Sequence, residues 1–290
     1  MIRKGTHILT TLLAAMFISS CSNTKHLPKG ETLYVGTDID IKDNNASKRE
    51  RKVLKEDLAG AVLPRPNKKV LGVRLKLTAY NVVKGYDSSR KPKGIRKLLL
   101  KFGEGPVLSS QFNLDKNQKL LVNILENKGF FFPTVTGELK TNERKRMSRS
   151  KFDVLTGPQY KIQDVQFVQD DRQVSKDLWA QREKTLFKQD APYNLDLIKG
   201  ERQRIDARLK EIGYYYFTPD HIIVRVDSSI GNHKVNMYVA VKDEIPEEAG
   251  KIYYVNKVFI NPNYRLGMGR FGRGISGSRG TTSMRAPTCN

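Results

Sequence analysis

An internal repeat constrains the fold of this chain more than any other feature of its sequence. Two stretches carry the same succession: a polar helix start, an amphipathic helix, a glycine followed by three aromatic residues, and two alternating segments. The first begins at Phe112-Asn113-Leu114-Asp115 and reaches its glycine at Gly129. The second begins at Tyr193-Asn194-Leu195-Asp196 and reaches Gly213. The repeat predicts small domains of one fold in series rather than a single large core.

Each copy is predicted to end in a β-hairpin, because apolar and polar residues alternate on both sides of a polar turn. The asparagine before each helix is a suitable N-cap, and the glycine ends its last turn. Another strand then opens the next unit, at 160–165 and, in matching register, at 253–258. The predicted hairpin strands are 134–139 with 152–155 in the first copy and 221–226 with 235–241 in the second.

Residues 171–187 read as the first helix of the second unit, which gives the order β, α, α, β, β. We therefore predict an α+β fold of tandem βααββ modules, with two helices packed on a small three-stranded sheet. Upstream, we expect a strand within 30–41, a charged helix within 47–63 and another strand within 69–83, where Val73, Leu75 and Leu77 alternate with basic residues. This region holds a further unit or two.

The N-terminus has the features of an export signal. Arg3 and Lys4 precede an apolar run over 8–18, and the run is too short for a membrane-spanning helix of about 20 residues. Ile18-Ser19-Ser20-Cys21 resembles a lipobox, so we expect Cys21 to be the attachment point for diacylglycerol and palmitate chains. The alternative is an ordinary cleavable signal that contains a cysteine by chance.

Composition limits the chemistry and the partners. The formal net charge is +22, and only Arg3 and Lys4 of that excess lie in the leader. Behind an export signal, the available anions are phospholipid headgroups, lipopolysaccharide and acidic protein segments, so we expect no nucleic-acid partner. Two cysteines and four histidines without zinc spacing predict no disulfide framework, no metal site and no cofactor. No catalytic motif or acid–base pair stands out, so we expect a binding protein and not an enzyme.

Four segments resemble a known family. The residues that carry the likeness are Cys21-Ser22-Asn23-Thr24-Lys25-His26-Leu27-Pro28-Lys29-Gly30, Gly103-Glu104-Gly105-Pro106-Val107-Leu108, Gly129-Phe130-Phe131 and Gly213-Tyr214-Tyr215. They resemble the POTRA modules of the BamA/TamA superfamily of outer-membrane assembly factors, in its TamA-like lipoprotein branch. The resemblance covers nearly all of the chain from Cys21 to Pro262, and its repetition in register makes coincidence a poor explanation.

The resemblance implies a lipid-anchored arm at the outer membrane that faces the periplasm and receives unfolded outer-membrane proteins or assembly-complex subunits. Its physical mechanism would be β-augmentation, in which an extended client pairs with an exposed edge strand. The candidate edges are the second strands of the two modules, 131–139 and 221–227, and the sequence does not decide which edge is open. The candidate client-binding residues are Phe131, Val135, Leu139, Ile222, Val224 and Val226.

A basic stretch lies in the first hairpin turn, and its residues are candidates for contact with lipid headgroups. The alternative is a solvated charged loop. A rival function, from another class, is a structural envelope lipoprotein whose basic surface binds lipopolysaccharide or peptidoglycan. The candidate headgroup residues are Arg144, Lys145, Arg146 and Arg149.

The expected domain organisation follows from these patterns. A signal peptide (1–20) precedes an N-terminal POTRA-like region (21–102) and two POTRA-like modules (103–158 and 159–248). Residues 249–264 would supply the first strand of a further module. The Gly/Arg-rich tail over 265–290 has no apolar period and no recognisable strands of the barrel that family members carry. Either the protein is naturally soluble apart from its lipid, or the sequence is a truncated or frame-shifted fragment of a longer chain. We favour the fragment, because the module that begins near Lys251 stops after one predicted strand.

Overall fold

The structure, a computed structural model, describes residues 23–43, 47–84 and 94–258. The expected leader, Cys21 and the Gly/Arg-rich tail lie outside the described residues. Contacts divide the chain into two units. The first comprises 1–164 with 189–196 and 227–236, and the second comprises 165–188, 197–226 and 237–290.

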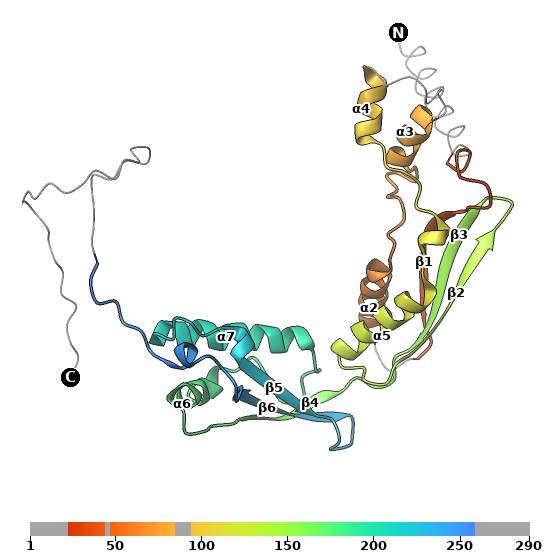
Figure 1. Ribbon diagram of the computed structural model, residues 1–290. Coiled ribbons are helices and arrows are strands. Elements are labelled where there is room, and N and C mark those ends of the chain that lie inside the picture. Colours follow the sequence, from red (N-terminus) through yellow and green to blue (C-terminus); the bar gives the residue numbers. More distant parts are fainter. Residues whose placement is uncertain (1–22, 44–46, 85–93, 259–290) are drawn as a thin grey trace, which may run out of the picture. The chain divides into compact units, whose positions relative to one another are not determined.

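The first sheet has its last strand in the middle. Its order is β1 (Leu33–Ile41), β3 (Met147–Leu155), β2 (Thr134–Asn142). β1 runs parallel to β3, whereas β2 pairs with β3 in the antiparallel sense. Two helices, α2 (Lys48–Ala61) and α5 (Leu114–Asn127), lie on one face of this sheet (Figure 1). The result is a two-layer module of the predicted order β, α, α, β, β.

The first core lies between these two layers. The rings of Tyr34 and Phe112 stack with centroids 5.1 Å apart, and Phe152 follows at 6.4 Å from Phe112. Leu58 of α2 and Leu121 of α5 are completely buried against them. Each such side chain contributes about 1.5–3 kcal/mol when it leaves water, so this core holds the helices on the sheet.

Local signals set the ends of these helices. At the start of α2, Ser47 and Glu50 form a capping box, with each side chain bonded to the other residue's main-chain N–H. Asn113 caps α5 through the Lys116 N–H at 2.8 Å, as the repeat predicts. The matching Asn194 accepts the Asp196 N–H at 2.8 Å at the start of the second long helix.

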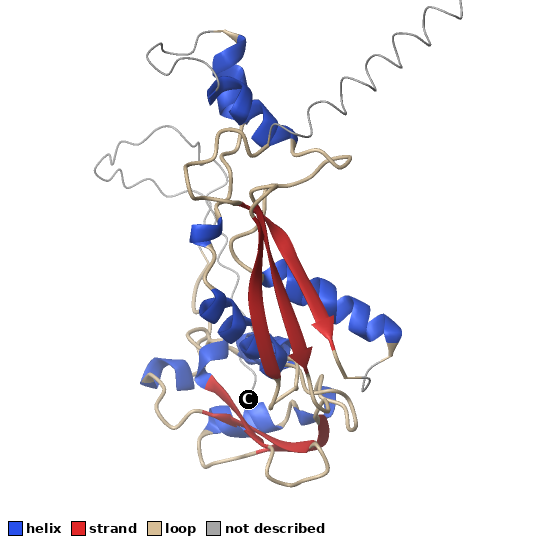
Figure 2. Ribbon diagram, turned by 90° about the vertical axis from the view of Figure 1, so that its right-hand side faces the viewer, coloured by secondary structure: helices blue, strands red, loops and turns tan. Residues whose placement is uncertain are grey.

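The second sheet has the same strand order as the first, β4 (Lys161–Phe167), β6 (Lys234–Val241), β5 (Ile222–Asp227). The strands of both sheets are drawn in red in Figure 2. The helices of this copy are α6 (Gln173–Trp179) and α7 (Leu195–Ile212). Every second residue of β6 is buried, which is the alternation of a strand covered on one face. The predicted fold class, α+β with tandem βααββ modules, is confirmed.

The region before residue 103 departs from the expected organisation. β1 and α2 belong to the first sheet and core, together with β2 and β3, so one module draws on both sides of the boundary we expected at 102. The strand expected within 69–83 is wrong, because residues 75–84 form helix α3 (Leu75–Lys84). Leu77 and Asn81 are buried one helical turn apart, as in a helix with one covered face. The alternation of apolar and basic residues over 73–77 is short, and such a short pattern led to the prediction of a strand. A second helix, α4 (Ile95–Phe102), follows.

Short 3₁₀ turns connect several elements, at Ser109–Gln111, Arg182–Lys184, Pro219–His221 and Glu247–Gly250. The strand expected at 253–258 does not form, since residues 251–258 carry no helix or strand.

Both glycines that end the long repeat helices anchor the chain that starts the next unit. The Tyr160 N–H donates to the Gly129 carbonyl at 2.9 Å, and the Tyr253 N–H donates to the Gly213 carbonyl at the same distance. Gly129 has φ +89° and Gly213 has φ +119°, a region that L side chains rarely adopt. The repeated glycine therefore fixes both the helix end and the departure of the following segment.

The first of these joints is closed by aromatic rings. The Phe131 ring lies 4.8 Å from that of Tyr160 and 5.0 Å from that of Tyr193, between ring centroids. The His233 ring meets that of Tyr160 edge-on, with centroids 5.5 Å apart. Rings in such tilted arrangements contribute about 0.5–1.5 kcal/mol per pair beyond their buried area.

Substitution of Gly129 by alanine tests this joint. A Cβ at Gly129 would lie 2.8 Å from the Tyr193 carbonyl oxygen, whereas one at Gly157, also at positive φ (+67°), would meet nothing within 4 Å. We expect Gly157→Ala to lower the free energy of unfolding by about 1 kcal/mol through backbone strain alone. Gly129→Ala should cost about 2–4 kcal/mol, because the collision adds to that strain. Urea unfolding of the two variants checks this, and equal costs would contradict the close approach.

Candidate functional site

The outer strands of the two sheets differ in how much of their edge is covered. In the first sheet, the segment before α5 pairs with the start of β1, with an antiparallel bridge between Leu33 and Leu108 and a bond from the Tyr34 N–H to the Val107 carbonyl at 2.8 Å. In the second sheet, the segment before α7 pairs with the start of β4 in the same way, with a bridge between Lys161 and Pro192. Within residues 23–43, 47–84 and 94–258, no strand pairs with the outer edge of β2 or β5.

The register shows which peptide groups of β2 face outward. The Lys42 N–H donates to the Val154 carbonyl at 2.9 Å, so the carbonyl of Val154 points towards β1 and away from β2. Val135 is the residue opposite Val154 in the antiparallel pair. This pair is therefore the non-hydrogen-bonded kind, and the N–H and C=O of Val135 point away from β3. By alternation along the strand, the same groups of Gly137 and Leu139 also face outward.

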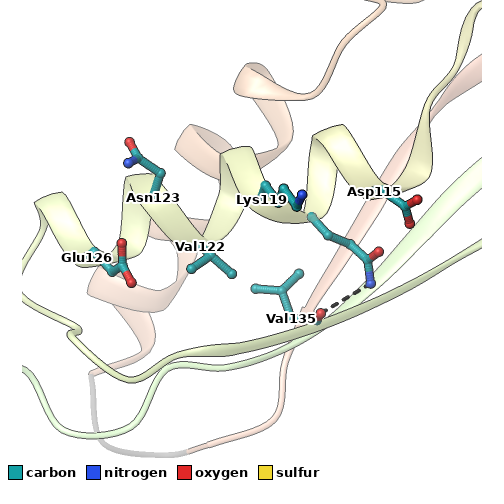
Figure 3. Close-up of a pocket in the computed structure, with 7 residues that line it drawn as sticks. Asp115, Lys119, Val122, Asn123, Glu126 and Val135 are labelled. Atoms are coloured by element: carbon teal, nitrogen blue, oxygen red, sulfur yellow. Dashed lines mark hydrogen bonds between the residues drawn. The ribbon is translucent and has the colours of Figure 1, made fainter.

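A side chain of α5 supports this assignment independently. The Gln118 Nε2 donates to the Val135 carbonyl at 3.3 Å, across the edge of the sheet. The dashed line in Figure 3 marks this bond. Gln118 thus occupies the first outward carbonyl of the edge, and a pairing strand would have to displace it there.

A groove runs between α5 and the β2 edge (Figure 3). Val122 on the helix and Val135 on the strand give it an apolar floor, and charged side chains of both signs stand along the helix above them. An extended segment laid here could pair with the β2 main chain while its side chains contact the valines. The lining residues are Asp115, Gln118, Lys119, Val122, Asn123, Glu126 and Val135.

Gly137 lies at the middle of this edge for a steric reason. A Cβ there would lie 2.5 Å from Cδ1 of Phe152 and 3.1 Å from Cδ1 of Leu114. The buried Phe152 ring thus occupies the space that a side chain of residue 137 would need. A larger residue at this position would push the core against the edge strand.

Charged side chains meet where β1 ends beside β3. The Lys42 Nζ lies 2.6 Å from the Asp40 carboxylate and 3.6 Å from that of Asp153. The hydrogen bond from Lys42 lowers the pKa of Asp40. Because these groups are exposed to solvent, their contribution to stability is small.

The structure places the candidate edge residues as follows. Val135 and Leu139 lie in β2 and are half-buried on its core face. On β5, Ile222 is buried, and Val224 and Val226 are half-buried. Phe131 precedes β2, and its ring packs in the joint with Tyr160 and Tyr193 instead of on the edge. Sequence reasoning missed Gly137 and Gln118, whose roles depend on cross-strand and helix-to-strand contacts.

The basic hairpin turn has a structural role at one of its residues. The Arg146 guanidinium reaches the carbonyls of Thr24, Leu27, Pro28 and Glu31, at 3.4, 3.3, 2.5 and 3.1 Å. The Arg149 Nη1 lies 2.8 Å from Asp38 Oδ1 on β1. Arg144 and Lys145 are exposed at the turn. Arg146 therefore ties the segment after Cys21 to the first sheet.

Neither a metal cluster nor a membrane-spanning helix occurs in the described parts of the chain. No group of three or more His, Cys, Asp or Glu side chains is placed there to hold a metal ion. None of the helices described is both long and apolar enough to cross a membrane.

No protein-family model matches this sequence, and neither does any curated protein. Among the solved structures similar to it is POTRA1-2 of the periplasmic domain of Omp85 from Anabaena, at 12% sequence identity and a TM-score of 0.33. Another is BamA POTRA3-5 of Haemophilus influenzae, at 13% sequence identity and a TM-score of 0.29. Each likeness covers 75% of this chain and 100% of the other chain. BamA from Haemophilus ducreyi lacking POTRA domains 1-3 shares 13% identity at a TM-score of 0.31, over 59% of this chain and 27% of that one. The fold described above rests on the strand order and packing of this chain, not on these likenesses.

Removal of the Arg146 side chain should release the segment it holds. We expect Arg146→Ala to make residues 24–31 more accessible to protease and to lower the free energy of unfolding by about 1.5–3 kcal/mol, because a charged donor to several carbonyls is lost. Arg144→Ala, at an exposed position of the same turn, is the matched control and should change neither. Limited proteolysis with mass spectrometry reads out the cleavage sites. Equal cleavage in both variants would contradict the assigned role.

Proposed function

We propose that this chain is a lipid-anchored periplasmic arm of an outer-membrane protein assembly or translocation factor, and that it binds unfolded client or partner proteins by β-strand augmentation at β2. The observation that carries the proposal is the row of outward-facing peptide groups at Val135, Gly137 and Leu139 beside the α5 groove. An edge of this kind recognises an extended backbone of almost any sequence. Binding, not catalysis, is what this arrangement can perform.

The strength of such pairing suits a handling role. A main-chain hydrogen bond contributes about 0.5–1.5 kcal/mol net in water. The few outward groups of β2 therefore hold a client weakly, and the valines of the groove add contact area. Weak, sequence-tolerant pairing lets a client leave again for its next partner.

β5 supplies a second edge with the same place in its sheet. It has six residues, against nine in β2, so it offers fewer outward groups. We assign β2 as the main site and β5 as an accessory site for an extended chain.

The proposed anchor is supported by sequence and by the packing of the segment that follows it. Cys21 ends a lipobox-like motif, and Ser22 rather than Asp follows it, which favours the outer membrane within the family it resembles. Arg146 then holds residues 24–31 on the first sheet. With such a short tether, the β2 edge would work close to the membrane face.

We also propose that a further module begins after the second joint. Tyr215 occupies the position of Phe131 in the repeat, yet it is 70% exposed, and Tyr254 beyond it is 83% exposed. In the first joint, Tyr193 of the following segment covers Phe131 at 5.0 Å. An aromatic residue from a following module would cover Tyr215 in the same way.

Two variants of Leu139 separate the main chain from the side chain at the proposed site. Leu139→Ala removes the side chain and keeps the outward N–H, whereas Leu139→Pro removes both and places a ring at the edge. We expect a labelled peptide of about ten residues, with the apolar–polar alternation of an outer-membrane β-strand, to bind Leu139→Ala within about threefold of the parent and Leu139→Pro at least about tenfold more weakly. Fluorescence anisotropy measures both. Equal losses in the two variants would reject main-chain pairing.

Ionic strength separates this function from the rival basic-surface lipoprotein. Main-chain pairing is nearly insensitive to salt, whereas a basic surface that binds lipopolysaccharide or peptidoglycan loses affinity as salt screens its charges. We expect the peptide affinity to change less than about threefold between about 0.05 and 0.5 M sodium chloride. A steep fall for the peptide, with tight binding of lipopolysaccharide at low salt, would favour the rival.

A further inference from the structure

The first module carries an insertion that the second copy lacks. Between α2 and α5 it contains helices α3 and α4, which pack on each other, whereas α6 and α7 are joined by a short segment with one 3₁₀ turn. Exposed large hydrophobic side chains gather in this insertion, and Leu71 within it is 98% exposed. A cluster of hydrophobic side chains on a water-facing surface indicates a site that contacts a lipid phase or a partner protein.

Helix α4 presents the clearest apolar face. Ile95, Leu98 and Phe102 follow the i, i+3, i+7 spacing of one helix face, and they are 77%, 66% and 54% exposed. No residue of α4 is buried. The same eight residues include exposed Lys97 and Lys101 and no acidic residue. The opposite side carries these cations together with Leu100, which is 37% exposed. An apolar face beside basic residues, without acidic ones, is typical of a helix that lies in a membrane interface.

The chain holds this insertion next to the proposed lipid site. Asn23 is buried against α3, where its side-chain oxygen accepts from Thr78 at 3.3 Å and its carbonyl accepts from Asn81 at 3.4 Å. Ser22 alone separates Asn23 from Cys21, so at most about 7 Å of extended chain lies between them. A lipid on Cys21 would therefore bring α3, and α4 packed on it, to the membrane surface.

We propose that α4 is a membrane-interface helix, which inserts Ile95, Leu98 and Phe102 among the headgroups of an anionic bilayer while Lys97 and Lys101 bind lipid phosphates. A lipid surface fits this face better than a protein does, because the helix carries cations without acids and lies beside the proposed anchor. The inference rests on the proposed anchor for its location only. It concerns the insertion and not the client-binding edge, so either can fail without the other.

Vesicle co-sedimentation tests the proposal with a chain that begins at Ser22 and therefore has neither leader nor lipid. The probes are vesicles of phosphatidylcholine alone and of phosphatidylcholine with phosphatidylglycerol. We expect binding to the anionic vesicles, and at least about tenfold weaker partitioning for Leu98→Asp. Val53→Asp makes the same change on an exposed position of α2 and should leave partitioning within about twofold of the parent.

Charge reversal provides a second pair of variants. Lys97→Glu with Lys101→Glu should lower partitioning to anionic vesicles at least about tenfold, whereas Lys52→Glu with Lys55→Glu, of equal charge change on α2, should lower it less than about threefold. The depth of α4 in the bilayer is measured by tryptophan fluorescence of Leu98→Trp. The variant is made in a Trp179→Phe background, since Trp179 is the chain's single tryptophan. Its emission should shift to shorter wavelength with anionic vesicles.

Three results would overturn the proposal. The parent chain could fail to bind anionic vesicles, the two members of either variant pair could lose binding equally, or the emission at position 98 could stay unchanged. The other possible occupant of this face is a second copy of the chain, and sedimentation velocity without lipid tests for it. A dimer that Leu98→Asp dissociates would make this face an interface between two copies. Peptide binding to Leu98→Asp should equal that of the parent, which separates this outcome from failure of the β2 site.

Discussion

The parallel pairing of β1 with β3 decides which side of the first sheet can accept another strand. Both edges of β3 are paired, one with β1 and the other with β2, so β2 is an outer strand of the sheet. On the opposite side, the segment before α5 pairs with the start of β1, at Leu33 and Tyr34. No strand of the described residues pairs with the outer edge of β2, and α5 forms the wall of the groove along this edge. The proposed client site thus follows from the order of strands, not from any special side chain.

The repeat shows that this arrangement is a property of the module. Both sheets place the third strand in the centre and leave the second strand outermost. In both, the segment before the long helix, α5 or α7, pairs with the start of the first strand. Both long helices end at a glycine whose carbonyl receives the N–H of a tyrosine. A chain built in this way gains a pairing edge with each added module. The insertion with α3 and α4 is what distinguishes the first module from the second.

The sequence predicted the elements of the repeat well, because the signals there are local. The caps at Asn113 and Asn194, and the alternation of the hairpins, depend on neighbours within a few residues. The membership of β1 in the first sheet could not be predicted, since its partner β3 lies more than a hundred residues further along the chain. The sequence indicated the second strand of each module as a candidate edge, but it did not decide which edge is open. The outward peptide groups of β2 depend on one cross-strand register and on the reach of Gln118, neither of which leaves a pattern in the sequence.

Amide hydrogen exchange along β2 tests the central claim most directly. If the edge is open, the N–H groups of Val135, Gly137 and Leu139 face water and should exchange quickly, while those of Thr136, Glu138 and Lys140 pair with β3 and should be protected. Addition of a bound strand should then slow the three fast amides. Uniform protection along the strand in the free protein, or the opposite alternation, would contradict the account.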